Sequence, residues 1–541
     1  MRSPAPIIFL AATLLVDANP LSASQQPVAE SIYLKGLLPS GAPVRAVRDI
    51  GGENVSMEGE AIACANCHRR SGLGSVEGQT ISPPIASHYV DRRQPFTPTT
   101  LARAVREGIG PEGRVLNNLM PRFDLSDTQI ALLAKYLKTL SSTASPGVDA
   151  DSLHIATIIT PDADAARRQA MLRVLMQFFA DQGRGEHFYL DGKLNDHPPH
   201  RGIPRGPLQN SARQWKLHVW ELNGTADSWE RQLRSNIARE PVFAVVSGLG
   251  RDNWAPIHHF CEAQALPCLF PNVEVPTLAE NDFYTFYYSK GVVLEAGLMA
   301  DALQRALPEH NIRQVVQVFR SRDSGASGAS ALRQSLARSR VPVVMRELPA
   351  DFDSTDATQR TSELAAAMAG VTSTDALVLW LRAWDLAALP TGPPVAFAIF
   401  SGMMGGLEQV PISPSWRAII HLSYPFDLPR DRAVRMQLPL QWFSLRHVDV
   451  TDERLQSDTY LACVILASTL GRMSGVFVRD YLIEKAEDTL SKRWTNAYYP
   501  RLSFAPGQRV GSRGGFVVHF AGSEGTAVEP DGDWIVPVSP Y

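Results

Sequence analysis

The stretch Cys64-Ala65-Asn66-Cys67-His68 has the spacing Cys-x-x-Cys-His, which is typical of a covalent attachment site for a c-type haem. In such a site both thiols add to one edge of the macrocycle, and the following imidazole binds the iron. The spacing is a physical requirement, because both sulfur atoms must reach that edge while the histidine stands under the centre. We therefore predict one covalent haem, with Cys64 and Cys67 as attachment residues and His68 as an axial iron ligand. Two unrelated thiols beside a loop histidine are the alternative.

Length and composition indicate a multidomain globular chain. Its 541 residues exceed one ordinary domain, and its 45% hydrophobic and 20% charged residues are ordinary for a globular protein. A net charge of −3 gives no argument for nucleic acid or an anionic membrane surface. No stretch approaches 18 uncharged apolar residues, so we expect no membrane span.

The N-terminus predicts an export signal over residues 1–24. Arg2 supplies a positive start, residues 7–16 an apolar run, and Ser22-Ala23-Ser24 a small-residue cleavage site. The mature chain would begin near Gln25 and be periplasmic. This location agrees with the haem motif, since bacterial c-type attachment takes place outside the cytoplasmic membrane.

Residues 25–145 predict a small haem domain. Thr97-Pro98 predicts the start of a helix that ends at Gly108, and Ser126-Asp127-Thr128-Gln129 forms a capping box that opens another. Upstream of the haem motif, residues 31–35 and 43–48 flank a turn and predict a β-hairpin.

These features resemble class I cytochrome c, a small and mostly α-helical fold. The family places its second axial ligand, a methionine, on a loop just before the last helix, and Met120 fills that place. The family also uses a proline carbonyl to orient the axial histidine, which points to Pro83 or Pro84. Packing of Met120 in the core, Met57 as the ligand, and prolines that only stiffen a turn remain open.

A thioether opposite an imidazole raises the potential of the iron and leaves no open coordination position. Such a site transfers electrons and does not activate oxygen. The sequence contains no evident set of nucleophile, base and orienting residue, so we predict no catalytic residues and favour an electron carrier over an enzyme. A peroxidase-like use of the haem remains an alternative, and it would require an open axial position.

Residues 151–541 predict two α/β lobes after a linker near 141–150. Short runs that are apolar on both faces recur between helical stretches, as is typical of parallel sheets. The first series is 154–160, 217–222, 242–247 and 266–270, and the second is 315–319, 342–345, 376–381 and 395–400.

This order resembles the type I periplasmic substrate-binding proteins, whose ligand lies between two lobes. The stretches that carry the resemblance include 241–248, 265–271, 287–291 and 499–504. The likeness places candidate ligand contacts at loops following strands: Ser247, Gly248, Asn272, Ser324 and Gly325. Each is also compatible with an ordinary turn.

Three further features leave alternatives open. Cys261 and Cys268 are compatible with a disulfide or with two buried thiols, whereas Cys463 fits a small core residue. The stretch 511–515 favours a hairpin turn over a phosphate cradle. A polar stretch favours a solvated loop over a metal site, because the spacing of its ligand-type residues matches no rigid chelate: His187, Asp191, Asp196, His197 and His200.

Taken together, the sequence predicts an exported electron-transfer protein in which a haem domain is joined to a ligand-binding or partner-binding module. The expected partner is a redox protein, such as a periplasmic dehydrogenase or another cytochrome, and a small-molecule ligand remains open. The alternative is a solute receptor whose haem domain reports redox state or docks a partner.

Overall fold

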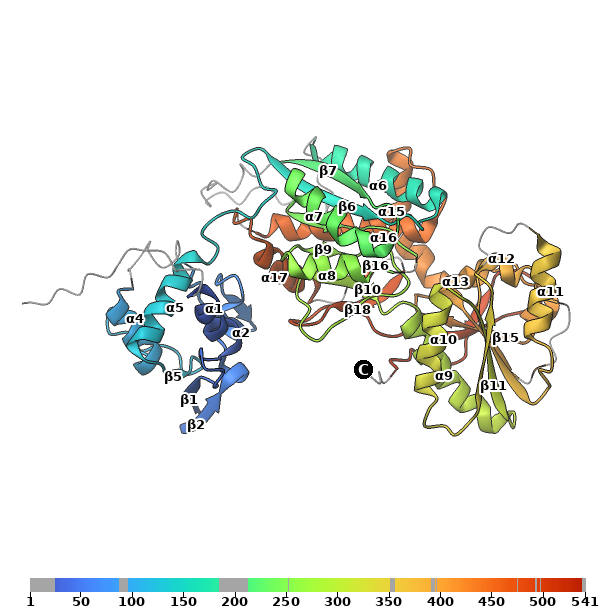
Figure 1. Cartoon of the computed structure of the whole chain (residues 1–541), viewed down its shortest axis with the longest axis horizontal. Helices are drawn as coiled ribbons and strands as arrows, with labels where there is room; N and C mark the ends of the chain where they lie inside the picture. Colours follow the sequence, from blue (N-terminus) through green and yellow to red (C-terminus); the bar gives the residue numbers. More distant parts are fainter. Residues whose placement is uncertain are drawn as a thin grey trace, which may run out of the picture. The chain divides into compact units, whose positions relative to one another are not determined.

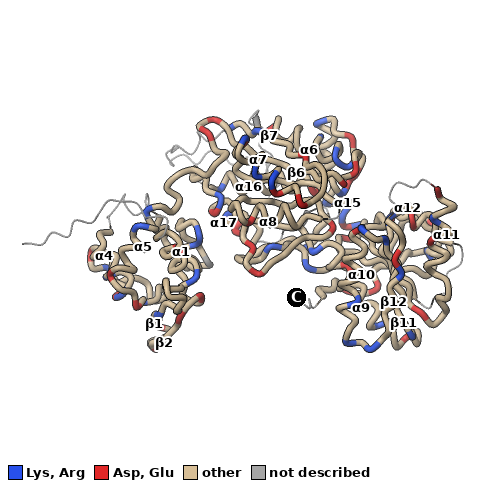
Figure 2. The backbone as a smooth tube through the Cα atoms, in the orientation of Figure 1, with Lys and Arg blue, Asp and Glu red and all other residues tan. Residues whose placement is uncertain are grey.

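The computed structural model describes residues 25–86, 96–183 and 213–537, apart from 252, 351–355, 391–394, 396, 474, 492–493 and 497. The chain divides into two compact units at Ala144 and Ser145 (Figure 1). The predicted export signal lies outside the described residues. Within them, no helix combines the length and hydropathy needed to cross a bilayer. Basic and acidic residues are interspersed along both units (Figure 2).

The first unit combines short helices with short strands. Its elements are α1 (Gln26–Lys35), β1 (Arg45–Ile50), β2 (Glu53–Glu58), the 3₁₀ turn η1 (Gly59–Ile62), α2 (Cys64–His68), β3 (Ser75–Glu77), β4 (Thr80–Ser82), α4 (Pro98–Glu107), β5 (Arg122–Asp124) and α5 (Asp127–Thr139). The last two helices confirm the predictions. Thr97 caps α4, and Ser126 and Gln129 form the capping box of α5.

The predicted hairpin is wrong in its first half. Residues 26–35 form α1, which ends at Gly36 in the left-handed conformation. Its buried residues share one helix face: Ala29, Ile32 and Tyr33. The helix packs against α5, with the rings of Tyr33 and Tyr136 5.5 Å apart. The hairpin comes one connection later, as β1 and β2, and it separates α1 from the haem motif.

Strand β1 is the centre of a three-stranded antiparallel sheet with the order β2-β1-β5. Ala46 of β1 pairs with Met57 on one side and with Phe123 on the other. Because β5 directly follows the loop that carries Met120, the pairing of β1 with β5 ties the hairpin to the end of that loop.

The second unit contains two lobes, each built on its own sheet (Figure 1). The first lobe begins with β6 (Ser152–Ile159), α6 (Ala165–Gly183), β7 (Gln214–Glu221), η3 (Ala226–Ser228), α7 (Trp229–Arg239), β8 (Ala244–Val246), α8 (Ala255–Ala263), β9 (Cys268–Leu269) and β10 (Thr285–Ser289). Its sheet has the order β18-β10-β9-β8-β6-β7, and all its pairings are parallel.

The second lobe follows with α9 (Val292–Glu309), β11 (Gln314–Arg320), α10 (Ser324–Ser335), β12 (Val343–Leu348), α11 (Ala357–Ala367), β13 (Asp375–Trp380), α12 (Ala383–Leu386), β14 (Phe397–Ser401), α13 (Gly402–Gly405), η4 (Leu407–Gln409), α14 (Pro414–Arg417) and β15 (Ile420–Tyr424). Its first five strands pair in parallel, in the order β12-β11-β13-β14-β15. The strands of both predicted series are therefore confirmed.

The chain then returns to the first lobe with α15 (Pro429–Leu445), α16 (Glu453–Gly471), α17 (Arg479–Leu490), β16 (Trp494–Asn496), β17 (Tyr499–Leu502) and β18 (Val510–Ser512). It ends in the second lobe with β19 (Phe516–Phe520) and β20 (Val528–Pro530). These strands extend that sheet, β19 antiparallel to β15 and β20 antiparallel to β19.

The expectation of a hairpin turn at 511–515 is wrong. Its first residues belong to β18 of the first lobe, and β19 of the second lobe starts at Phe516. The stretch is therefore a crossover between lobes. Glycine is needed here because a Cβ on Gly515 would lie 2.7 Å from the backbone of Tyr424 and Pro425. A crossover leaves the same local pattern of small residues as a hairpin does.

Candidate functional site

The Cys-x-x-Cys-His stretch forms the one-turn helix α2, which ends at Arg69 with a positive φ of 64°. Helical spacing puts Cys64 and Cys67, three residues apart, on one face, and His68 four residues from Cys64 on the same side. Neither thiol is in a disulfide. Burial raises the pKa of Cys64 to about 12, so this sulfur is held as a neutral thiol.

The imidazole of His68 is oriented by one backbone contact. Its Nδ1 lies 2.9 Å from the carbonyl oxygen of Pro83, just after β4. With Nδ1–H donating to this carbonyl, Nε2 carries the lone pair with which an imidazole can bind a metal ion. Burial lowers the pKa of His68, although the contact with Pro83 opposes this shift. The histidine is thereby kept neutral, which is the form that binds iron. Pro84 lines the same cavity.

A cavity of about 1560 Å³ lies against α2. It exceeds the roughly 300–1,000 Å³ of ordinary small-molecule pockets. Cys64, Cys67 and His68 line it, together with apolar side chains that include two highly exposed ones, Ile81 at 71% and Val115 at 72%. Large apolar side chains around a cavity of this size fit a flat, largely apolar macrocycle.

Met120 also lines this cavity, on the loop between α4 and β5. The guanidinium of Arg122 holds the loop, donating from Nη1 to the carbonyl of Met120 at 2.5 Å and from Nη2 to that of Leu116 at 3.3 Å. Gly108 makes room for this contact, because a Cβ there would lie 2.0 Å from the guanidinium carbon. Met57 lines the cavity as well. Both methionines that the sequence offers as iron ligands, Met57 and Met120, therefore line the same cavity.

The residues present fit a covalently bound haem. Two thiols on one helix face, a neutral imidazole with an oriented ring and thioether side chains border one cavity. The cavity also contains an arginine, Arg48, whose Nε is buried without a hydrogen-bond partner. A haem is apolar in its plane and carries two carboxylates, so this set matches its chemistry.

In the second unit, the structure brings together three of the five candidate ligand contacts. Asn272 Nδ2 donates to Ser247 Oγ at 2.8 Å, and the backbone N–H of Asn272 donates to the carbonyl of Gly248 at 2.9 Å. Ser324 lies apart, where its hydroxyl donates to Glu274 Oε2 at 2.5 Å. Gly325 is packed tightly, since a Cβ there would lie 2.6 Å from the carbonyl oxygen of Trp380.

A small pocket of about 20 Å³ lies between the two lobes, and sequence reasoning missed most of its residues. Its lining includes Asn272 and Tyr288 of the first lobe and Met403 of the second. Two more lining residues, the half-buried Arg454 and the buried Asp458, form an ion pair one turn apart on α16. Burial raises the pKa of Asp458 to about 7 against the opposing charge of Arg454. Two opposite charges one turn apart, just before the apolar run of α16, were the available signal.

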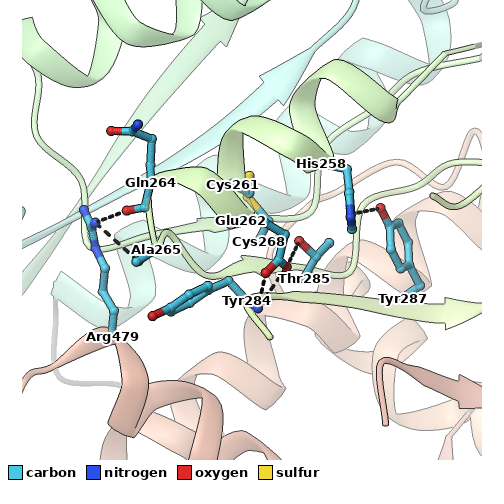
Figure 3. The surroundings of a disulfide bond; sticks show 10 residues. All are labelled: His258, Cys261, Glu262, Gln264, Ala265, Cys268, Tyr284, Thr285, Tyr287 and Arg479. Carbon is cyan, nitrogen blue, oxygen red and sulfur yellow. Dashed lines mark hydrogen bonds between the residues drawn. A yellow bond between two sulfur atoms is a disulfide. The ribbon is translucent and has the colours of Figure 1, made fainter. Parts of the chain in front are cut away.

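Cys261 and Cys268 form a disulfide that joins α8 to β9, which resolves the alternative left open by the sequence (Figure 3). Arg479 of α17 donates to the carbonyls of Gln264 and Ala265, which lie between the two cysteines. The disulfide and the arginine thus fix the same short connection. Cys463 is buried in α16, as predicted.

His258, Glu262 and Asp282 lie close enough to hold a metal ion, but their polar atoms are already used. The two ring nitrogens of His258 contact Tyr287 and Asp282, each at 3.1 Å. The Glu262 carboxylate accepts from the amides of Phe283 and Tyr284 and from Thr285. This is a satisfied structural network. The polar stretch that contains His187, Asp191, Asp196, His197 and His200 lies outside the described residues.

Residues 57–141 match the family model of cytochrome c. Among curated proteins, no sequence matches the chain. A substrate-binding periplasmic protein from Ralstonia solanacearum superposes with a TM-score of 0.52 at 13% identity, over 70% of this chain and 100% of that one. A possible leucine/isoleucine/valine-binding protein from Rhodopirellula baltica SH 1 gives 0.50 at 13% identity, over 71% and 97%. The chain therefore joins a cytochrome c domain to a unit with the fold of type I periplasmic substrate-binding proteins.

Proposed function

We propose that this chain is an exported, periplasmic electron carrier with one covalent c-type haem, coupled to a module that binds a partner or a ligand. Cys64 and Cys67 would attach the haem, and His68 and Met120 would supply ligands to its iron. When bound, the haem supplies a one-electron iron couple. The observation that carries the proposal is the common cavity of these four residues, in which Pro83 orients the imidazole.

The chain's own residues keep the site suited to electron transfer. Pro83 fixes the tautomer of His68, and Arg122 holds the backbone that presents Met120. Apolar side chains around the cavity exclude water, which favours the less charged ferrous state and raises the potential. With both axial positions filled by side chains, the site carries electrons between a periplasmic dehydrogenase or another cytochrome and an acceptor.

Met120→Ala tests the axial assignment, and Met57→Ala is its matched control, because both side chains line the cavity. The full chain is produced in a host that matures c-type haem. We expect M120A to lose the long-wavelength methionine–iron absorption band and to fall in midpoint potential, whereas M57A keeps both. An unchanged spectrum and potential in M120A would reject Met120 as the ligand. If M57A instead loses the band and falls in potential, Met57 is the iron ligand.

A solute receptor is the second candidate function, favoured by the two-lobed fold. The space between the lobes, about 20 Å³, holds roughly one water molecule, so a solute would have to open the lobes. Thermal melting in the presence of candidate solutes distinguishes the two functions. A receptor is stabilised by about 2.7 kcal/mol at a solute concentration of 100 Kd, whereas an electron carrier without a solute site is not.

A further inference from the structure

The hairpin of β1 and β2 in the haem unit has a face on the cavity. It lies between α1 and α2, and the match to the cytochrome c family model begins at residue 57, inside β2. Its register pairs Ala46 with Met57. Ala46 is buried in the core of the unit, and Met57 lines the cavity.

Arg48 lies on the same face of β1 as Ala46, because successive side chains of a strand alternate between its faces. It too lines the cavity. The sheet supports this position, since Arg48 pairs with Val55 of β2 and the three preceding residues of β1 also pair with β5. Asp49 adds a further tie, accepting from Asn118 Nδ2 at 3.2 Å on the Met120 loop.

The guanidinium of Arg48 has a buried donor without an acceptor. Its Nε is enclosed and makes no hydrogen bond. Leaving such a donor unsatisfied is unfavourable, and more so for a charged group. Arg114 and Lys138 also line the cavity in the described part of the chain, but both are exposed. Water can solvate their charges, which it cannot do for the buried Nε of Arg48. Arg48 therefore calls for an anionic acceptor inside the cavity.

We propose that Arg48 donates to a propionate carboxylate of the haem and is its counter-ion. The inference rests on the proposed function, because it requires a haem in this cavity. A guanidinium matches a carboxylate in geometry and charge and satisfies its own buried donor in doing so. The hairpin then has a role in the redox chemistry: it places a fixed positive charge near the iron and keeps the propionate ionised.

Arg48→Gln tests the proposal in the full haem-bearing chain, with Arg45→Gln as the matched control. Arg45 lies on the same strand, but its side chain is 73% exposed and pairs with the exposed Glu58. The midpoint potential is measured against pH. We expect R48Q to fall in potential, since removing a positive charge favours ferric iron, and to gain a pH dependence between about pH 5 and 8 as the unpaired propionate titrates. R45Q keeps the wild-type profile.

Identical profiles of R48Q, R45Q and wild type would overturn the proposal. If R48Q does not incorporate haem, Arg48→Lys is the second variant, because lysine keeps the positive charge but lacks the paired donors of a guanidinium. We expect its potential–pH profile to change in the same direction as predicted for R48Q, but by less. A wild-type profile in this variant would overturn the proposal. Failure of the proposed function would look different from failure of the Arg48 proposal. In that case the wild-type chain itself would lack covalently bound haem or the methionine–iron band.

Discussion

Glu274, on the segment between β9 and β10 of the first lobe, is bound at both carboxylate oxygens by Arg382, which follows β13 of the second lobe. The two distances are 2.9 Å to Nη1 and 2.7 Å to Nη2, and both side chains are buried. Asp323 holds the same guanidinium from the other side at 2.6 Å. A carboxylate of one lobe thus occupies a cationic site in the other.

Glu274→Gln should destabilise the second unit by about 3 kcal/mol, because it leaves the buried Arg382 with one carboxylate instead of two. The measurement is urea unfolding followed by a probe of the second unit. Glu230→Gln is the control: its ion pair with Arg234 is exposed, so its loss should cost less than about 1 kcal/mol. Equal effects of the two variants would contradict the importance of the Glu274 contact.

Glu274 also predicts an acid sensitivity. Burial would raise its pKa, but the charge of Arg382 outweighs burial and holds the pKa at about 2. Because this folded-state pKa lies below the unfolded value of about 4.3, its contribution is present above that value and is lost as the pH falls toward 2. The difference in stability between wild type and E274Q should therefore shrink over this window. A difference independent of pH would contradict the prediction.

Glu295 should show the opposite dependence. It is buried and accepts hydrogen bonds from Ser401, Ser423 and the amide of Met403, and no ion pair joins it to a cation among the described residues. Burial raises its pKa to about 7. The protonated form is favoured in the folded state, so its stabilising contribution is present below about pH 4.3 and is lost as the pH rises to 7.

Glu295→Gln, which is neutral at every pH, should remove this dependence and raise stability at pH 8 relative to wild type, by up to about 3 kcal/mol. The same unfolding assay at pH 5 and pH 8 measures it. An E295Q variant less stable than wild type at both pH values would mean that the ionised carboxylate is the stabilising form.

The cysteines predict one alkylatable thiol. With Cys64 and Cys67 attached to haem and Cys261 bonded to Cys268, only Cys463 remains of the 5 cysteines. Alkylation of the denatured, unreduced holoprotein followed by peptide mapping should label this residue alone. Labels on Cys261 and Cys268 would mean that the disulfide does not form.

Replacing both Cys261 and Cys268 by alanine should lower the free energy of unfolding by about 2 kcal/mol, which is the loop-closure contribution of so short a loop.

Arg122→Ala should loosen the loop that presents Met120, because two carbonyls lose hydrogen bonds from a charged donor. We expect a loss of about 1.5–3 kcal/mol in thermal unfolding of the holoprotein and loss of the methionine–iron band at a lower pH than in wild type. Arg114→Ala, an exposed arginine on the same loop, is the control. A band equally stable in both variants would mean that Arg122 does not hold the loop.

Local patterns predicted much of the structure because their physical causes are local. The capping residues Thr97 and Ser126 start helices through bonds to amides three residues away. The inner strands of the second unit, such as β13 and β14, are apolar runs buried on both faces of parallel sheets, and such a run can be recognised without knowing its partner strand. The first helix was missed because its apolar face is short, and a Pro-Ser-Gly turn beside it resembles that of a hairpin.

By itself, the sequence determined the haem attachment motif, the helices with strong caps and the alternation of strands and helices, since each is written in neighbouring residues. Only the tertiary structure decided that Pro83 faces His68, that Arg48 reaches the cavity and that Glu274 meets Arg382. The last two residues are 108 positions apart in the chain. Such contacts depend on how whole elements pack, and the same side chains would be ordinary surface charges in another arrangement.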